Sequence, residues 1–393
     1  MAKLSIRDIQ VKGKKVLVRV DFNVPQDEKL EVRDDTRIKE ALVTIKFIID
    51  NGGKAILISH LGRPDGKVVE KMRMAPIAKK LGELLGKYVL TADDCIGENV
   101  EKLVAGMKDG DVLLLENVRF HPEEEDNDPT FAKKLAGLCD IYVNDAFGTA
   151  HRAHASTEGV AKFVKQAAAG FLMEKEIKYL GMILEKPVRP ILAIIGGAKI
   201  SSKIDLLNNL LSKVDNIIIG GGMAYTFMRA QGKKTGKSLL EADKIDIAGE
   251  ILNKAVEKGV KLYLPVDHIV AETKDNPKDI RTVTDIPDNM IAFDIGPKSL
   301  EQFTNVVKAS RTIFWNGPLG LFEVDAFAKG TISIAKTIAE SGNTSVVGGG
   351  DSVSAIKKAG VTGKITHIST GGGASLEFIE GKELPGIAAL TGR

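Results

Sequence analysis

Short apolar, β-branched runs alternate with amphipathic stretches from one end of the chain to the other. The runs KKVLVRV (14–20) and KAILIS (54–59) have the length and composition of buried strands. Between them, segment 34–53 spaces its apolar residues for one helical face and ends at two glycines. Further strand-like runs follow at 111–117 and 141–146. Strands that alternate with helices in this way predict a mostly parallel sheet covered by helices on both faces.

The strand–helix pattern restarts after residue 184. Two prolines and several charges make EKPVRP (185–190) a poor continuation of either element, so we place a domain boundary there, with a long bridging helix as the alternative. The later strand-like runs are 191–195, 216–220, 261–271, 311–317, 344–349 and 365–370. The predicted fold class is therefore α/β, with two doubly wound parallel-sheet (Rossmann-like) domains joined by a hinge.

Length and composition are those of a globular protein. The 393 residues are 44% hydrophobic and 27% charged, with a net charge of +3. This length predicts two domains, and the interspersed charges argue against a nucleic-acid or membrane-surface footprint. Cys95 and Cys139 form no disulfide or metal pattern, which favours a reducing, cytosolic location. The sequence shows no signal-peptide pattern and no apolar run of membrane-spanning length.

The predicted strand ends of the first half carry charge. In open parallel sheets, ligands bind at the carboxyl ends of the strands. Eight of the thirteen arginines precede residue 153. The residues near these ends are Asp21, Asn23, His60, Arg63, Arg119, His121, His151, Arg152 and His154, with Arg37 in the first turn of the helix after Asp21. The four arginines favour a small anionic ligand, because guanidinium groups pair bidentately with phosphate and carboxylate.

The predicted strand ends of the second half carry glycine. The clusters are IIGGAKISSK (194–203), IIIGGGMAY (217–225), FWNGPLGLFE (314–323), VVGGGDS (346–352) and STGGGAS (369–375). Glycine lets the backbone approach a ligand, and the helix N-terminus that follows offers free N–H groups to an anion. With Asp351 directly after the fourth cluster, the pattern favours a polyphosphate and Mg²⁺. No cluster matches G-x-G-x-x-G, so a dinucleotide is disfavoured.

Further charged motifs have a functional or a structural interpretation. Lys199 and Lys203 lie four apart on one face of a predicted helix start, where they could bridge phosphates. The segment GKKTGKS (232–238) is no P-loop, because only three residues separate its glycines; we interpret it as a helix stop and a solvated turn. The H-x-x-H pair at 151–154 lacks a third metal ligand. The acidic run HPEEEDND (121–128) is interpreted as a solvated loop.

These motifs are parts of a longer ordered set. It comprises VRVDFNVP, SHLGRP, ENVRFHPEE, NDAFGTAHRAHAS, GGAKISSK, GGGMAYTF, WNGPLGLFE, VVGGGDS and STGGGASLEFIEGKELPG. From about residue 16 to residue 386, the set resembles the motifs of the phosphoglycerate kinase family. The resemblance implies a glycolytic and gluconeogenic enzyme that transfers a phosphoryl group reversibly between ATP and the carboxylate of 3-phosphoglycerate, giving ADP and 1,3-bisphosphoglycerate.

The resemblance also implies domain and residue roles. The domains would be 1–185, which binds 3-phosphoglycerate, 186–375, which binds the nucleotide, and a segment 376–393 that returns to the first domain. The glycerate would be bound by Asp21, Asn23, Arg37, His60, Arg63, Arg119 and Arg152. The nucleotide would be bound by Lys203, Gly220, Gly221, Ala292, Asn316, Pro318, Glu323, Gly349, Gly350, Asp351 and Ser352, with Mg²⁺ on Asp351. The catalytic residues would be Arg37, Lys199, Gly372 and Gly373.

The implied mechanism is domain closure about a hinge near residues 184–190, with charge neutralisation. No general base is expected, because a carboxylate nucleophile is already ionised at neutral pH. The resemblance implies a monomer, whereas the cytoplasmic location and the absence of nucleic-acid and membrane partners are expected from the cysteines and the charge distribution. A nicotinamide-dependent oxidoreductase is one alternative, but it would need the missing dinucleotide fingerprint. A non-enzymatic nucleotide-binding sensor is the other, but it would have no need of four arginines and Lys199.

Overall fold

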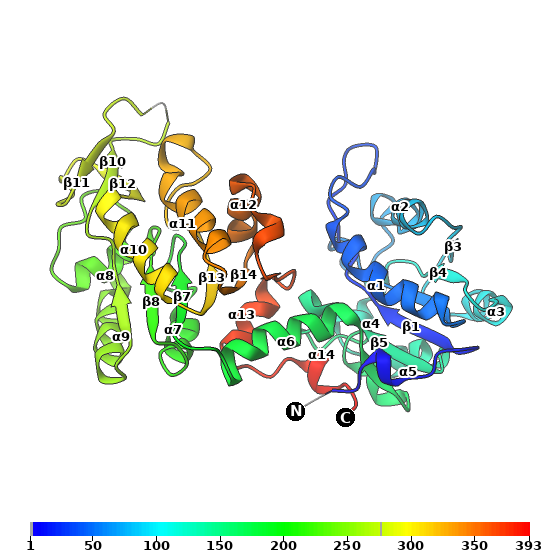
Figure 1. Ribbon diagram of the computed structural model, residues 1–393. Coiled ribbons are helices and arrows are strands. Elements are labelled where there is room, and N and C mark those ends of the chain that lie inside the picture. The colour runs from blue at the N-terminus through cyan, green and yellow to red at the C-terminus, as the bar shows by residue number, and fades with distance from the viewer. Residues whose placement is uncertain (1–2, 276) are drawn as a thin grey trace. The chain divides into compact units, whose positions relative to one another are not determined.

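The computed structural model describes residues 3–275 and 277–393 (Figure 1). The chain divides into two compact units: residues 3–178 with 383–393 form unit 1, and the described part of 179–382 forms unit 2. Helix α6 (Phe171–Glu185) runs across the boundary at residue 178. The first boundary thus lies after residue 178, seven residues before the predicted end of the first domain at 185. The second lies after residue 382, seven residues beyond the predicted end of the second domain at 375. The prolines at 187 and 190 follow the end of α6, whereas the packing changes within the helix.

Unit 1 is built on a six-stranded parallel sheet with the order β3-β4-β2-β1-β5-β6. Its strands are β1 (Lys15–Arg19), β2 (Lys54–Ile58), β3 (Leu90–Thr91), β4 (Val112–Leu114), β5 (Ile141–Asn144) and β6 (Ala167–Ala169). The strand order reverses between β1 and β5, where Arg19 pairs with Asn144. Ligands bind beyond the carboxyl ends of the strands at such a reversal, so this edge is where a site is expected.

Helices cover both faces of the unit 1 sheet. They are α1 (Thr36–Asp50), α2 (Ala75–Leu85), α3 (Glu98–Gly106), α4 (Pro122–Glu125) and α5 (Pro129–Gly137), with 3-10 turns η1 (Ile6–Asp8), η2 (Glu70–Met72), η3 (Val118–Phe120), η4 (Phe147–Thr149) and η5 (Gly159–Phe163). As its spacing predicts, α1 buries Ile38, Ala41 and Ile45. Right-handed crossovers place α1 and α5 on opposite faces, because the strands β2 and β5 flank β1 on opposite sides (Figure 1).

Unit 2 repeats this architecture with the order β15-β14-β13-β7-β8-β9. Its parallel strands are β7 (Ile191–Ile195), β8 (Asn216–Ile219), β9 (Lys261–Tyr263), β13 (Thr312–Asn316), β14 (Thr344–Gly348) and β15 (His367–Ile368). Here the order reverses between β7 and β13. The expectation of two doubly wound parallel-sheet units is confirmed.

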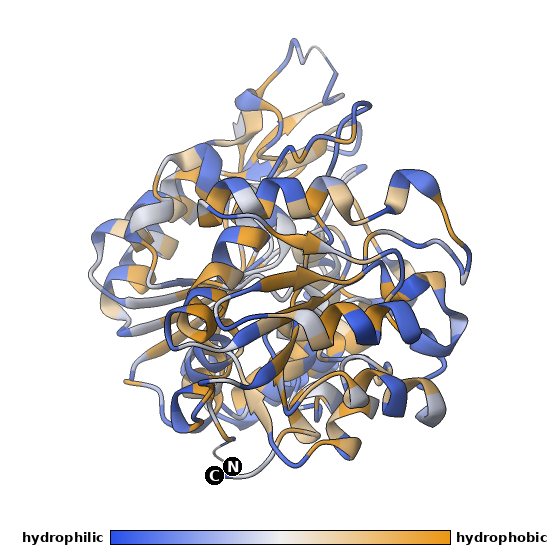
Figure 2. Ribbon diagram, turned by 90° about the vertical axis from the view of Figure 1, so that its right-hand side faces the viewer, coloured by the Kyte–Doolittle hydropathy of each residue, from blue (hydrophilic) through white to orange (hydrophobic). Residues whose placement is uncertain are grey.

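The helices of unit 2 follow its strands in turn. They are α7 (Ile204–Leu210), α8 (Met223–Ala230), α9 (Ile245–Glu257), α10 (Pro297–Ala309), α11 (Lys329–Glu340), α12 (Gly350–Ala359) and α13 (Gly373–Ile379), with 3-10 turns η6 (Ala242–Lys244), η7 (Asp325–Phe327) and η8 (Thr362–Lys364). Their apolar faces pack on the sheet, and Trp315 is fully buried in the resulting core. Figure 2 shows apolar strands and more polar outer helix faces. Across residues 3–275 and 277–393, no helix combines the length and apolar character of a membrane span.

A small antiparallel sheet in unit 2 departs from the sequence prediction. It has the order β11-β10-β12, formed by β10 (His268–Ala271), β11 (Arg281–Val283) and β12 (Ile291–Ile295). The run 261–271, predicted as one strand, is therefore divided between two sheets. Asp267 lies at the break, where its carboxylate accepts from the Ser299 N–H (2.8 Å) and hydroxyl (2.6 Å). These bonds hold the chain in a turn that the apolar pattern of the run does not reveal.

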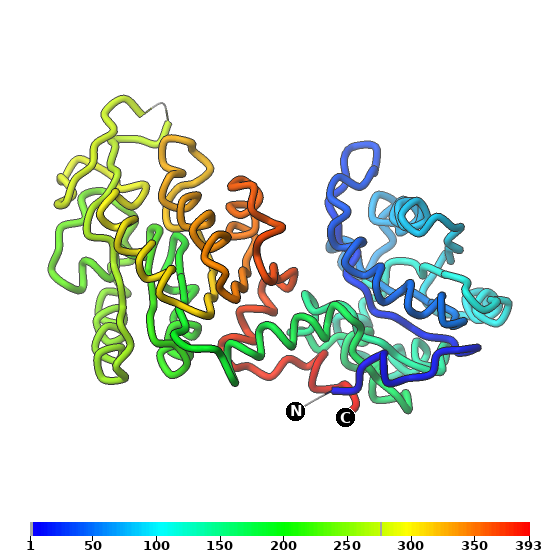
Figure 3. Tube along the Cα trace, in the orientation of Figure 1, coloured from blue at the N-terminus to red at the C-terminus, as the bar shows by residue number. Residues whose placement is uncertain are grey.

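The C-terminal segment lies beside the N-terminal residues of unit 1 (Figure 3). The Leu4 N–H donates to the Thr391 carbonyl at 2.8 Å. Helix α14 (Pro385–Ala388) is joined to the carboxyl end of β5, because Asn144 Nδ2 donates to the Gly386 carbonyl at 3.2 Å. Residues 383–393 thus belong to unit 1, together with the N-terminal part of the chain.

Candidate active site

Asp21, Asn23 and Arg37 lie together beyond the carboxyl end of β1. Arg37 Nη1 donates to Asp21 Oδ1 (3.1 Å) and to the Asn23 carbonyl (2.9 Å). Asn23 Oδ1 accepts from the Gly62 N–H, 3.0 Å away in the loop after β2. The Arg37 side chain is still 39% exposed. It therefore keeps guanidinium donors for a ligand, while Asp21 and Asn23 fix its direction.

His60 is held by a buried arginine that the sequence pattern did not single out. Arg19, the last residue of β1, is 1% exposed, and its Nη2 lies 3.1 Å from His60 Nδ1. A guanidinium only donates, so Nδ1 accepts and the ring hydrogen lies on Nε2. Burial, and then the charge of Arg19, lowers the pKa of His60 well below its usual range. The other charges acting on the ring are those of Arg119, Arg37 and Arg152. His60 is thus a neutral donor among arginines.

Glu124 is fully buried and Pro122–Glu125 form helix α4, so the interpretation of residues 121–128 as a solvated loop was wrong there, whereas Glu123 and Asp126 are exposed as expected. Its carboxylate accepts from the Ser156 N–H (2.8 Å) and hydroxyl (2.6 Å). The same hydroxyl accepts from Arg19 Nε at 2.8 Å. Burial raises the pKa of Glu124, and the charge of Arg19 opposes that shift. Glu124 and Ser156 therefore hold Arg19 in place behind His60.

The remaining arginines of unit 1 differ in their surroundings. Arg119 is 5% exposed, donates through Nη1 to the Gly62 carbonyl (2.9 Å) and pairs with Glu125. Arg152 donates to its neighbour His151. Arg63 is exposed in the loop after β2. The charges of Arg119 and Arg152 act on His60, so the structure brings these residues together, and Arg63 directly follows Gly62, whose carbonyl accepts from Arg119.

At the reversal between β7 and β13, the backbone of unit 2 is packed too closely for side chains. The Gly196 N–H donates to the Asn316 carbonyl (2.8 Å), and the Gly197 N–H donates to the Pro318 carbonyl (3.1 Å). A Cβ at Gly196 would lie 2.0 Å from the Pro318 carbonyl oxygen. Gly221 has φ +67°, and a Cβ there would lie 2.6 Å from the Gly197 carbonyl oxygen. These contacts require glycine at both positions.

Lys199 and Lys203 do not share a helix face, so that prediction was wrong. Helix α7 begins one residue after Lys203, and both lysines lie in the turns before it. The Ser201 N–H and hydroxyl donate to the Glu241 carboxylate at 3.0 and 2.6 Å, which holds these turns. Lys203 Nζ donates to Asn316 Oδ1, and burial lowers the pKa of Lys203. Lys199 is exposed.

The N-terminus of α12 carries a second group of predicted residues. Gly349 precedes the helix with φ +92°, and Gly350 is the first helical residue. Ser352 is buried, and its hydroxyl accepts from the Gly317 N–H at 2.6 Å. Asp351 is exposed in the first turn. Free backbone N–H groups and one outward carboxylate thus lie at the same helix end.

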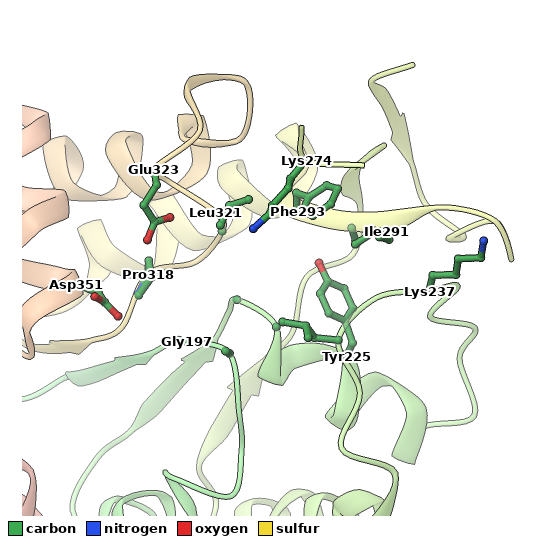
Figure 4. A pocket seen from close by; sticks show the side chains of 16 residues that line it. Gly197, Tyr225, Lys237, Lys274, Ile291, Phe293, Pro318, Leu321, Glu323 and Asp351 are labelled. Carbon is green, nitrogen blue, oxygen red and sulfur yellow. The ribbon is translucent and has the colours of Figure 1, made fainter. Parts of the chain in front are cut away.

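A cavity of about 410 Å³ opens among these elements of unit 2 (Figure 4). The predicted residues that line it are Gly221, Ala292, Pro318, Glu323 and Asp351. The predicted residues that do not line it are Lys199, Lys203, Gly220, Asn316, Gly349, Gly350, Ser352, Gly372 and Gly373. Gly372, with φ +54°, precedes α13, which contacts α7 through a hydrogen bond from Asn209 Nδ2 to the Ile379 carbonyl.

Tyr225, Lys237 and Lys274 also line the cavity, and the sequence did not predict them. In Figure 4, Tyr225 and Lys274 point into the space between Leu321 and Ile291, whereas Lys237 extends away from it. Lys237 is the residue of the GKKTGKS segment that lines the cavity. Thr235 and Ser238 of this segment are buried, so the prediction of a solvated turn was wrong at these positions. Lys274 comes from the loop after β10, a strand of the small antiparallel sheet that the sequence pattern did not predict.

Within residues 3–275 and 277–393, two places could hold a metal ion. Asp351 offers a hard oxygen donor beside the backbone N–H groups of α12, which fits Mg²⁺, since this ion takes one or two carboxylates together with substrate phosphates. Separately, Asp94, Cys95 and His121 in unit 1 place three ligand atoms within 4.8 Å of one another. The second group mixes oxygen, sulfur and nitrogen, so it does not suit Mg²⁺.

Comparisons with known proteins agree with this architecture. Residues 6–382 match the family model described as phosphoglycerate kinase. The chain is 59% identical over 392 residues to the phosphoglycerate kinase of Pelotomaculum thermopropionicum, with 99% of each chain covered. It is also similar to the solved structures of phosphoglycerate kinase from Coxiella burnetii (TM-score 0.91, 41% identity) and Pyrococcus horikoshii (TM-score 0.83, 34% identity), each over 98% of both chains. The chain therefore belongs to the phosphoglycerate kinase family and is a phosphotransferase.

Proposed function

We propose that this phosphotransferase moves a phosphoryl group between ATP and 3-phosphoglycerate by holding one substrate on each unit. The main observation behind this proposal is that the two units differ at their strand reversals. In unit 1, arginines surround a neutral histidine, and in unit 2, the backbone of glycine residues lines the reversal. The oxidoreductase and sensor alternatives are not favoured, because the whole chain matches a kinase family.

Unit 1 binds 3-phosphoglycerate in this proposal. Arg37 takes the carboxylate and the migrating phosphoryl group, and Asp21 and Asn23 bind the hydroxyl and carboxyl end. The phosphate is bound by His60, Arg63, Arg119 and Arg152. Support comes from the direction of the His60 ring: with Nδ1 occupied by Arg19, the Nε2 hydrogen remains for a phosphate oxygen. Guanidinium groups supply the matching bidentate donors.

Unit 2 binds the nucleotide in this proposal. Gly220, Gly221, Ala292 and Pro318 border the adenosine, and Glu323 binds the ribose. Asn316, Lys203, Ser352 and the amides of Gly349 and Gly350 take the phosphates. Asp351 holds Mg²⁺, which neutralises phosphate charge when it is bound. Lys199, with Gly372 and Gly373 ahead of α13, stabilises the group in flight.

The proposed chemistry needs positioning and positive charge and no proton transfer. The acceptor is a carboxylate, ionised at neutral pH, so no general base is required. Repulsion between two anionic substrates is then the main barrier, and arginines, Lys199 and backbone dipoles lower it. Direct transfer requires both substrates to meet, so we propose that the segment near residues 184–190 acts as a hinge for closure.

The test of this proposal is ATP consumption that depends on 3-phosphoglycerate, with the acyl phosphate product removed by a coupling enzyme. We expect turnover with 3-phosphoglycerate and Mg²⁺, and none with 2-phosphoglycerate or with chelator. ATP hydrolysis that is independent of 3-phosphoglycerate would contradict it. We also propose that the protein is a cytoplasmic monomer. Size-exclusion chromatography with light scattering tests the oligomeric state.

A further inference from the structure

Three different metal-ligand types meet in unit 1 outside the residues proposed for the reaction. Asp94 and Cys95 lie in the loop between β3 and α3, and His121 lies between η3 and α4. One ligand atom from each lies within 4.8 Å of the other two. Asp94 Oδ1 is 2.6 Å from His121 Nε2 and also accepts from the Cys95 N–H at 2.6 Å. The carboxylate is therefore the shared centre of the group.

The three side chains are held in place by their surroundings. The Asp94 carbonyl accepts from the Glu116 N–H (3.4 Å), which ties the loop to the end of β4. The His121 ring lies 5.2 Å from the Phe131 ring, centroid to centroid. Cys95 is fully buried, whereas the Asp94 side chain is 50% exposed and that of His121 is 25% exposed. An ion can thus enter from the side of Asp94 and His121 and reach a thiol that lies inside.

The donor set decides which ion the group suits. Mg²⁺ and Ca²⁺ take oxygen ligands, whereas thiolate and imidazole suit Zn²⁺ and related transition metals. Zn²⁺ commonly uses three protein ligands and one water, and a thiolate with a carboxylate would balance its two charges. We propose that Asp94, Cys95 and His121 form a site for Zn²⁺, separate from the proposed Mg²⁺ site at Asp351.

Binding would replace one existing interaction by three bonds. Without metal, His121 and Asp94 satisfy each other directly. With metal, each turns one atom to the ion, Cys95 binds as the thiolate, and the thiol proton is released to solvent. The ion would link the loop after β3 to the segment after η3, two stretches that are 26 residues apart at Cys95 and His121. It would therefore stabilise the folded protein by mass action.

Cobalt is the probe of choice, because thiolate ligation gives Co²⁺ a near-ultraviolet charge-transfer band that carboxylate and imidazole do not give. The full-length protein, freed of metal and of chelator, is titrated with Co²⁺ in excess Mg²⁺. We expect a saturable band at one equivalent, which Zn²⁺ removes and Mg²⁺ does not. A folded protein that shows no saturable band would overturn the proposal.

Variants assign the ligands. Cys95→Ser should abolish the charge-transfer band, whereas Cys139→Ser, which changes the other cysteine, should keep it. Because Cys95 is buried and its variant can misfold, Asp94→Asn and His121→Gln provide a second readout, and each should weaken Co²⁺ binding by about tenfold or more. Asp351→Asn should leave the band unchanged. A band that survives Cys95→Ser, or unchanged affinity in both Asp94→Asn and His121→Gln, would contradict the assignment.

Discussion

Arg19 Nη2 lies 3.1 Å from His60 Nδ1, and this contact fixes which ring nitrogen of His60 carries its hydrogen. The guanidinium has no acceptor, so the neutral ring must present Nε2–H on its other side. Both residues are buried, at 1% and 4% exposure. A neutral imidazole surrounded by arginines can donate its Nε2 hydrogen to a phosphate oxygen, while the arginines supply the positive charge.

The first prediction concerns the charge of His60. Burial, and then the charge of Arg19, lowers its pKa well below the usual value of 6.5. We therefore expect the ring to stay neutral, with the hydrogen on Nε2, through the pH range in which an exposed histidine takes up its second proton. Nitrogen-15 chemical shifts of the imidazole measure both properties directly. Titration of His60 with a midpoint near 6.5, or a hydrogen on Nδ1, would show that Arg19 does not act as described.

The second prediction concerns Asp145, which is buried after β5. Its Oδ1 accepts from the N–H groups of Leu172 (2.9 Å) and Met173 (3.2 Å) at the start of α6. Burial raises its pKa from 3.8 to about 7. Between these values the folded state binds more protons than the unfolded state, so this carboxyl costs stability as the pH rises through that window.

Comparison with Asp145→Asn tests this linkage. The stability of the wild type relative to the variant should fall from about pH 4 to about pH 7, by at most about 1.4 kcal/mol per pH unit, and level off above. Thermal denaturation across this range measures it. Asp126→Asn, at an exposed position, is the control and should show a constant difference. A constant difference for Asp145→Asn as well would mean that its pKa is not raised.

The third prediction separates two glycines that both have positive φ. Gly221 (φ +67°) has no room for a Cβ, which would lie 2.6 Å from the Gly197 carbonyl oxygen. Gly232 (φ +77°) has nothing within 4 Å of that position. Gly221→Ala should weaken ADP binding by about tenfold or more, because the cavity wall must shift. Gly232→Ala should cost only about 1 kcal/mol of stability and leave ADP affinity unchanged. Equal ADP affinities in the two variants, measured by calorimetry, would contradict this.

The fourth prediction concerns Lys274, which lines the cavity from the loop after β10. Its ammonium points into the space proposed for the nucleotide (Figure 4). Lys274→Ala should weaken ADP binding by about two- to fivefold, a modest effect because the side chain is exposed. Lys278→Ala removes an exposed lysine from the same loop and should have no effect. If the two variants bind ADP alike, Lys274 takes no part in the site.

The sequence predicted elements best where periodicity was long and unambiguous. Ile38, Ala41 and Ile45 identified the buried face of α1, because a helix of this length repeats its pattern several times. The run 261–271 was misjudged, since two short strands of different sheets read as one apolar segment. The turn between them depends on Asp267 and Ser299, which are 32 residues apart and meet only in the folded chain.

The sequence predicted candidate site residues that lie near the carboxyl ends of strands. It did not predict those that lie within a strand or a helix. Asp21 and Asp351 closely follow strands β1 and β14, where ligands of parallel sheets bind, and Arg37 lies in the first turn of the helix after β1. Arg19 lies within the apolar pattern of β1, and Glu124 lies in an acidic run, so nothing local marks either as buried. Tyr225 belongs to the buried face of α8, and only the packing of the later loops turns it into a cavity wall residue.

The proposed phosphoryl transfer assigns different parts of one reaction to guanidinium groups of unit 1 and to cations and amides of unit 2. Its most direct test is the turnover and substrate affinity of Arg37→Ala and Lys199→Ala, with Arg33→Ala and Lys258→Ala as exposed controls. We predict that both site variants lose turnover by about a hundredfold or more while the controls keep it, and that Arg37→Ala leaves ADP affinity nearly unchanged. Turnover near that of the wild type in both site variants would contradict the account.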